Sequence, residues 1–216
     1  DPATQRVIAF NGHSANATVL DAGSRSVVGT IALDGKPEIA RADGRGKVFV
    51  NIEDKAEMSE IDQKAATVVA TWSLPGCEDP SGLAIDVAHR RLFSACDNGR
   101  MAVTDADTGK HVADIPIGAG PDGAAFDPAR GLVYSSNGKD GTLTVAHEVD
   151  ADRYSVVATI PTQKSARTRV LDETTHRMYL PAAEFAPLPE NAPPHTRPPM
   201  KPDTFVVLVV GEAPLR

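Results

Sequence analysis

A repeat of about 42 residues constrains the fold of this chain more than any other feature of its sequence. The landmark of the repeat is an aspartate that ends a short strand-like segment and opens a tight turn. It occurs at Asp1, Asp43, Asp86, Asp127 and Asp172, with spacings of 42, 43, 41 and 45 residues. A period of this length is typical of solenoid and propeller architectures, so the repeat unit predicts the whole fold.

The clearest copy of the repeat, residues 120–160, reads as four short strands. The strand segments are GAAFD, LVYSSN, TLTVAHEV and SVVATI, and the turns between them are DPARG, NGKDG and DADRY. Turns rich in Asp, Asn and Gly connect neighbouring antiparallel strands. Four strands in 40 to 45 residues predict an all-β fold, a β-propeller of four-stranded antiparallel blades. No helical pattern of 10 to 15 residues separates the strands, as an α/β fold would require.

The repeat register divides the 216 residues into a single propeller domain of five blades. The blades are expected near residues 1–35, 36–78, 79–119, 120–163 and 164–216. The first blade lacks its innermost strand and the last lacks its outermost, which predicts 18 strands in all. Open blade edges of this kind tend to pair with other chains, so self-association is expected.

The best copies of the repeat carry a family resemblance. The pattern P-x-G-x-A-x-D-x-x-x-x-x-V-Y-x-x-N at Pro121–Asn137, followed by SVVATI at Ser155–Ile160, resembles the YVTN-repeat β-propellers. The resemblance covers nearly the whole chain except roughly Ala186–Asp203. It implies a periplasmic or extracellular protein of bacterial or archaeal type, and a ring that commonly has seven blades. The five blades are then part of a seven-bladed ring; a closed five-bladed ring or a swapped dimer is the alternative.

One segment departs from the repeat. Residues 186–203 contain seven prolines and interrupt the last blade between its second and third strands. Such a run favours extended polyproline II structure. It is interpreted as a loop insertion, either a simple surface decoration or a lid or docking arm for a partner.

Composition and cysteine content limit the function and location. The net charge of −7 disfavours a nucleic-acid surface, which needs clustered Lys and Arg. No apolar run is long enough for a membrane span. The two cysteines, Cys77 and Cys96, fall at the same edge of one blade, where either a disulfide or two free thiols would fit. A disulfide would indicate an oxidising compartment.

Loops that enter the first strand of a blade and loops that leave the second strand share one face of a propeller. Residues at equal offsets from the landmark aspartates should therefore form rings around the tunnel mouth on that face. The candidate residues for binding a ligand there are Asn11, Glu53, Asp97, Arg167 and Glu184. Among these, Arg167 brings a positive charge that could hold an anionic ligand.

Carboxylate and amide oxygens on this face suit a hard cation such as Ca²⁺. The candidate metal ligands are Glu38, Asp122 and Asn137, and the candidate proton acceptors are His13 and His195. His89, His111 and His176 fall in turns on the opposite face and are interpreted as plain surface residues. No zinc-binding motif and no G-x-S-x-G nucleophile motif occurs.

Two functions remain open at this point. The first is a non-catalytic extracytoplasmic propeller that binds a small ligand or a cell-envelope protein at its tunnel face. The second is a Ca²⁺-dependent hydrolase of lactones or esters, in which the metal polarises a carbonyl and activates water. No cofactor is certain, and Ca²⁺ is the candidate.

Overall fold

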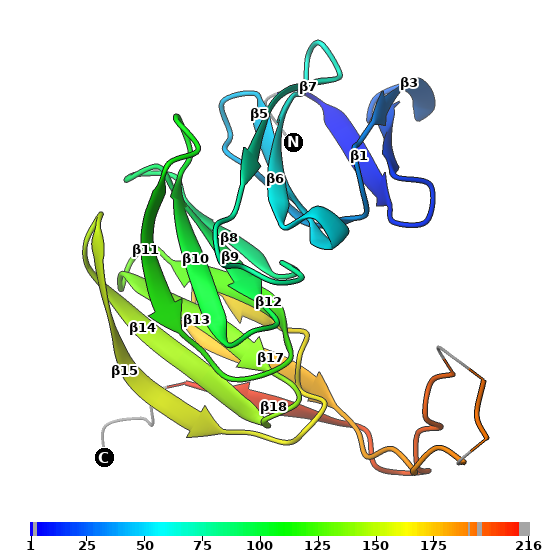
Figure 1. Ribbon diagram of the computed structural model, residues 1–216, viewed down its shortest axis with the longest axis vertical. Helices are drawn as coiled ribbons and strands as arrows, with labels where there is room; N and C mark the ends of the chain where they lie inside the picture. Colours follow the sequence, from blue (N-terminus) through cyan, green and yellow to red (C-terminus); the bar gives the residue numbers. More distant parts are fainter. Residues whose placement is uncertain (2–3, 190, 194–195, 212–216) are drawn as a thin grey trace.

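The computed structural model describes residues 1, 4–189, 191–193 and 196–211. Within them the chain forms eighteen strands and one short 3₁₀ helix, η1 (Glu53–Lys55). The strands make five antiparallel sheets of three, four, four, four and three strands, each in chain order. The sheets follow one another in an arc (Figure 1). The fold is therefore a β-propeller, and the strand count agrees with the sequence prediction.

The strand bounds follow the repeat. The first two sheets contain β1 (Arg6–Asn11), β2 (Asn16–Asp21), β3 (Ser26–Ala32), β4 (Pro37–Ala42), β5 (Lys47–Ile52), β6 (Glu57–Asp62) and β7 (Thr67–Ser73). The third and fourth contain β8 (Leu83–Asp86), β9 (Arg91–Cys96), β10 (Arg100–Asp105), β11 (His111–Pro116), β12 (Pro121–Asp127), β13 (Leu132–Asn137), β14 (Thr142–Asp150) and β15 (Arg153–Pro161). The fifth contains β16 (Val170–Asp172), β17 (Arg177–Ala182) and β18 (Val206–Val210).

The core lies between neighbouring sheets, because both faces of the three middle blades are covered. Side chains alternate along a strand, so in β5 Val48 packs toward the first blade and Phe49 toward the third. Phe93 in β9 and Tyr134 in β13 occupy the position of Phe49 and pack against the next blade in the same way. Four such clusters join the five blades.

The landmark aspartates shape the turns between the first two strands of the blades. The Asp86 carboxylate accepts the Ala88 N–H at 2.9 Å, and Asp127 accepts the Ala129 N–H at 3.1 Å. The residue four positions after the landmark then adopts positive φ, as in Arg90, Gly131 and His176. This geometry fixes where the next strand starts.

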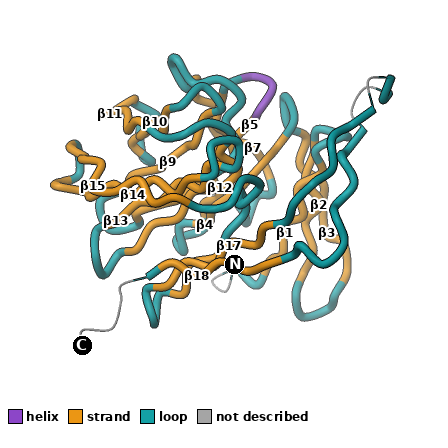
Figure 2. The backbone as a smooth tube through the Cα atoms, turned by 90° about the horizontal axis from the view of Figure 1, so that it is seen from below, coloured by secondary structure: helices purple, strands orange, loops and turns teal. Residues whose placement is uncertain are grey.

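The inner strands of the blades are β4, β8, β12 and β16, and they line the space that we term the channel. β8 contacts both β4 and β12, and β12 contacts β16. Small residues allow this approach: a Cβ atom on Gly82 would lie 2.6 Å from the carbonyl carbon of Gly123. Figure 2 shows the chain from below, with the strands as orange segments joined by teal loops.

The last blade carries the proline-rich segment between β17 and β18, and Figure 1 shows it projecting from the blades. The outer face of this blade exposes Val170, Val207 and Val209. In the part of the chain that the structure describes, no helix is long and apolar enough to cross a membrane.

Candidate functional site

A pocket of about 350 Å³ lies at the mouth of the channel. Loops of four blades line it: those after β5, β9 and β13, and those before β8, β12 and β16. It brings together four residues that the repeat offsets predict for this face, and these are Glu53, Asp97, Asp122 and Arg167. Ser81, Asp79 and Lys139 join them.

The carboxylates at this pocket are mostly paired with cations. Lys139 Nζ lies 2.8 Å from Asp97, and Arg167 Nε lies 3.4 Å from Asp122. Glu53 forms an ion pair with Lys36. The mouth is therefore close to electrically balanced, although sequence alone suggested an acidic ring.

Glu38 belongs to a different part of the face. Its carboxylate lies 2.8 Å from Lys36 Nζ, and its side chain lines a separate pocket beside β1. The hydrogen bonds from Lys36 to Glu38 and to Glu53 raise the pKa of Lys36 above its ordinary value. The lysine thus serves as the counter-ion of two predicted site residues.

Two predicted asparagines do not face the mouth. Asn137 is fully buried; its side-chain amide donates to Thr142 and Thr144, and its side-chain oxygen accepts from Ser135. Asn11 likewise donates to Asn16 and Thr18 in its own blade. Each side chain links the second strand of its blade to the third. The prediction that Asn11 and Asn137 face the mouth of the channel is therefore wrong.

The predicted calcium ligands therefore do not converge. Glu38 is bound to Lys36, Asp122 faces Arg167, and Asn137 is satisfied inside its blade. An ion needs 6 to 8 oxygen ligands around one point to be held as Ca²⁺. The repeat placed the Cα positions on one face correctly, but it did not determine the side-chain directions.

The remaining predicted residues lie apart from the pocket. His13 is exposed in the turn between β1 and β2. Glu184 forms an ion pair with Lys201 at 2.9 Å, at the base of the proline-rich segment. His195 lies outside the described residues. A catalytic pair of His13 and a bound metal finds no support in this geometry.

Two arginines inside the channel were missed by the sequence reasoning. Arg41 in β4 and Arg169 beside β16 line one pocket of about 320 Å³. Among the described residues neither makes an ion pair with a carboxylate, and the buried Nε of Arg169 has no hydrogen-bond partner. Burial lowers the pKa of Arg169 to about 10, and the charge of Arg41 adds to this shift. Both remain positively charged at neutral pH.

An apolar pocket of about 620 Å³ adjoins the mouth, beneath the proline-rich segment. Phe185, Met200 and Phe205 contribute to its wall. It shares Ser165 and Arg167 with the mouth pocket. A ligand at the mouth could therefore extend an apolar part under this segment.

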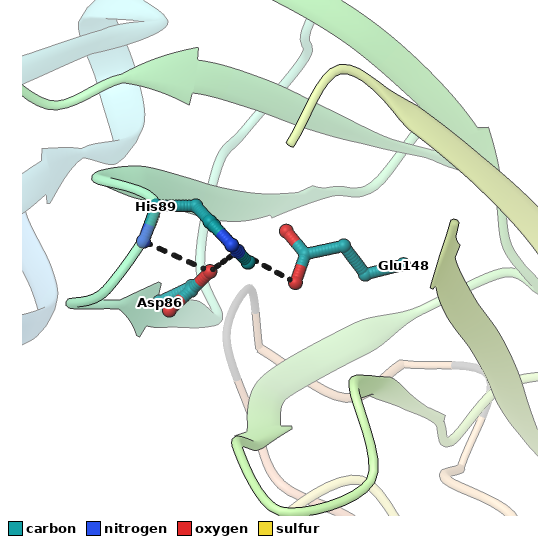
Figure 3. A group of neighbouring side chains, drawn as sticks. All are labelled: Asp86, His89 and Glu148. Carbon is teal, nitrogen blue, oxygen red and sulfur yellow. Dashed lines mark hydrogen bonds and ion pairs between the residues drawn. The ribbon is translucent and has the colours of Figure 1, made fainter. Parts of the chain in front are cut away.

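A second cluster lies at the junction of the third and fourth blades, and Figure 3 shows its three side chains pointing toward one another. His89 Nδ1 lies 2.7 Å from Asp86 Oδ2 and 3.3 Å from Glu148 Oε2. Burial raises the pKa of Glu148, and the Asp86 charge adds to it. The hydrogen bond to Glu148 raises the pKa of His89. The interpretation of His89 as a plain surface residue is therefore wrong.

His176 is not a plain surface residue either, since it lies 2.7 Å from the fully buried Asp127. His176 contacts the landmark aspartate of the preceding blade, whereas His89 contacts the landmark aspartate of its own turn and Glu148 of the next blade.

Comparison with known proteins supports the fold. No family model matches the chain, and no curated protein matches it either. Among solved structures, a chain of Kuenenia stuttgartiensis hydrazine synthase superposes with a TM-score of 0.73 at 17% sequence identity. The match covers 97% of this chain and 60% of that one. At this level of identity the likeness concerns the fold alone.

Proposed function

We propose that this chain is an extracytoplasmic binding propeller that takes a small organic anion in its channel. The observation that carries the proposal is the pair Arg41 and Arg169, two positive charges that line one pocket. Glu173 also lines this pocket, but among the described residues no carboxylate forms an ion pair with either arginine. Desolvated cations are costly unless a partner offsets their charge. A bound carboxylate would supply that partner, and a guanidinium fits it in a bidentate manner.

The mouth of the channel is compatible with such a ligand. Three of its four carboxylates have cationic partners, in Lys36, Lys139 and Arg167. Arg167 also borders the apolar pocket beneath the proline-rich segment. The proposed ligand class is therefore a small carboxylic acid, bound by its charged end to the arginines of the channel.

The location outside the cytoplasm is supported by the cysteines. Cys77 and Cys96 form a disulfide with a Cα separation of 5.3 Å, so the sequence prediction that they lie together is confirmed. Disulfides persist mainly in oxidising compartments. The resemblance to YVTN-repeat propellers favours the same location, in the periplasm or outside the cell.

The described side chains give no support to the hydrolase alternative. It required a metal held by Glu38, Asp122 and Asn137 and a nearby histidine, and these side chains occupy separate environments.

The proposal is tested by titrating the protein with succinate, benzoate and phenylacetate in a calorimeter, with the corresponding amides as neutral probes. We expect saturable binding of at least one acid and none of its amide. Arg169→Gln should weaken that binding tenfold or more, because the charged end loses its partner.

Arg45→Gln is the matched control, since Arg45 is an exposed arginine in the turn between β4 and β5. It should bind as the unchanged protein does. Equal affinity for acid and amide, or unchanged binding in Arg169→Gln, would contradict the proposal.

A further inference from the structure

The junction of the third and fourth blades holds a mixed set of metal-ligating groups away from the channel. Asp86 ends β8, His89 lies in the turn that follows, and Glu148 lies in β14 of the next blade. One donor atom from each residue lies within 4.8 Å of the others. The side chains of Asp86 and Glu148 are 2% and 4% exposed, whereas that of His89 is 54% exposed.

The same three repeat positions occur at the junction of the first and second blades with different chemistry. There they are Asp1, Thr4 and Gln63. The backbone shows that they correspond: Gln63 N–H donates to the Gly46 carbonyl, as Glu148 N–H donates to that of Gly131. The Thr4 hydroxyl contacts Asp1 at 3.0 Å and Gln63 at 2.9 Å. A neutral hydroxyl and amide are therefore sufficient to join two blades at this place.

At two other junctions the following blade supplies a basic side chain to the landmark aspartate. Arg90 lies 3.1 Å from Asp43, and His176 lies 2.7 Å from Asp127. The corresponding residue of the fourth blade is Gly131, which has no side chain. At this junction the following blade places the carboxylate of Glu148 near Asp86, where the other two junctions have a basic side chain. Two buried carboxyl groups therefore share one half-exposed histidine.

We propose that Asp86, His89 and Glu148 form a binding site for a divalent transition-metal ion such as Zn²⁺, which links the third blade to the fourth. A bound cation offsets the repulsion between the two carboxylates more fully than the half-exposed histidine and the hydrogen bond from the Tyr154 hydroxyl to Glu148 do. One imidazole nitrogen and two carboxylate oxygens suit Zn²⁺ or Mn²⁺ better than the softer thiophilic ions.

The distances fit such an ion after a small adjustment. Ligand atoms about 2 Å from a tetrahedral Zn²⁺ lie about 3.4 Å from one another. The imidazole nitrogen now lies 2.7 and 3.3 Å from the two carboxylate oxygens. His89 is on the solvent side, which gives an ion access and leaves the fourth position to water. The Asp86 carboxylate is already oriented by the backbone N–H of Ala88.

The test is a calorimetric titration of the full chain, without a histidine tag, with Zn²⁺ in metal-free buffer. We expect one binding event for the unchanged protein. Glu148→Gln and His89→Thr introduce at this site the neutral residue types that join the first and second blades, Gln63 and Thr4. Each substitution should weaken Zn²⁺ binding tenfold or more. His89 is half exposed, so its replacement tests the site without disturbing the core.

His176→Gln is the matched control, because His176 contacts a single carboxylate and should not hold the ion. It should bind Zn²⁺ as the unchanged protein does. A second measurement is thermal melting, in which Zn²⁺ should raise the melting temperature of the unchanged protein but not of His89→Thr. Unchanged affinity in His89→Thr, or loss of affinity in His176→Gln alone, would overturn the proposal.

Discussion

The Nδ1 atom of His176 lies 2.7 Å from Oδ2 of Asp127, a carboxylate that the fold buries completely. Asp127 belongs to the fourth blade and His176 to the turn that opens β17 in the fifth. The contact joins two blades whose interface is built mainly from apolar side chains, such as Tyr134 and Met178. It is therefore a polar link inside an apolar interface.

His176→Ala should lower the free energy of unfolding by about 1–3 kcal/mol, because it leaves a buried acceptor without its side-chain partner. Urea unfolding followed by circular dichroism measures this change. His13→Ala is the control, since His13 is exposed in a turn, and it should change stability by less than about 0.5 kcal/mol. Equal effects of the two substitutions would show that the contact contributes nothing.

The disulfide between Cys77 and Cys96 closes a loop with a sequence separation of 19. The double substitution Cys77→Ala, Cys96→Ala should lower the free energy of unfolding by about 3 kcal/mol, mainly because the unfolded chain gains freedom. Thermal melting with and without a reductant measures the effect. The reductant should lower the melting temperature of the unchanged protein and leave that of the double variant unchanged. A shift in the double variant would point to another cause.

Arg169→Met should leave the free energy of unfolding of the ligand-free protein unchanged or raise it by about 1 kcal/mol. Removing a desolvated charge that lacks a carboxylate partner often stabilises a fold. The lowered pKa of Arg169, caused by burial and by Arg41, reflects that cost. Urea unfolding measures the change, and Arg45→Met serves as the exposed control. A loss of several kcal/mol in Arg169→Met would mean that the arginine is needed for folding and not for a ligand.

Much of the fold could be predicted from the sequence because the landmark aspartates are local signals. Each opens a turn through bonds to its own neighbours, as Asp86 does with Ala88. Strands that follow such turns must pair in chain order. The repeat offsets also placed Asp122 and Arg167 correctly, since loops at equal offsets meet at one end of the channel.

Side-chain direction and contacts between blades could not be predicted in the same way. Asn137 ends β13 and turns into its own blade, a choice that depends on the alternation along that strand. Arg41 carries a signal in the sequence, since it stands two positions before its landmark aspartate, where two neighbouring inner strands carry Ala84 and Ala125. The contact of His89 with Glu148 joins residues 59 positions apart and required the structure.

Gly82→Ala should destabilise the fold by about 1–3 kcal/mol, as overpacking does in well-packed interiors. The added Cβ would lie 2.6 Å from backbone atoms of Gly123, and two inner strands cannot separate without disturbing their sheets. Gly29→Ala is the control, because its Cβ would meet only Ala66 at 3.8 Å. Urea unfolding of both variants measures the difference, and equal stability would show that the inner strands can move apart.

Asp62 should contribute stability that depends on pH. Its carboxylate accepts the backbone N–H groups of Ala65 and Lys64 at 2.8 and 2.9 Å, and the bond from Ala65 lowers its pKa below the ordinary value of 3.8. A carboxyl whose pKa is lowered by folding stabilises the protein above its unfolded pKa, and this contribution is lost as the pH falls through the folded value. Asp62→Asn keeps an acceptor oxygen but does not titrate. The unchanged protein should therefore be more stable than Asp62→Asn at pH 7, and the difference should shrink as the pH falls below 3.8. Urea unfolding of both proteins from pH 7 to pH 2.5 measures it, and a difference that stays constant over this range would show that the ionised carboxylate has no special role in the turn.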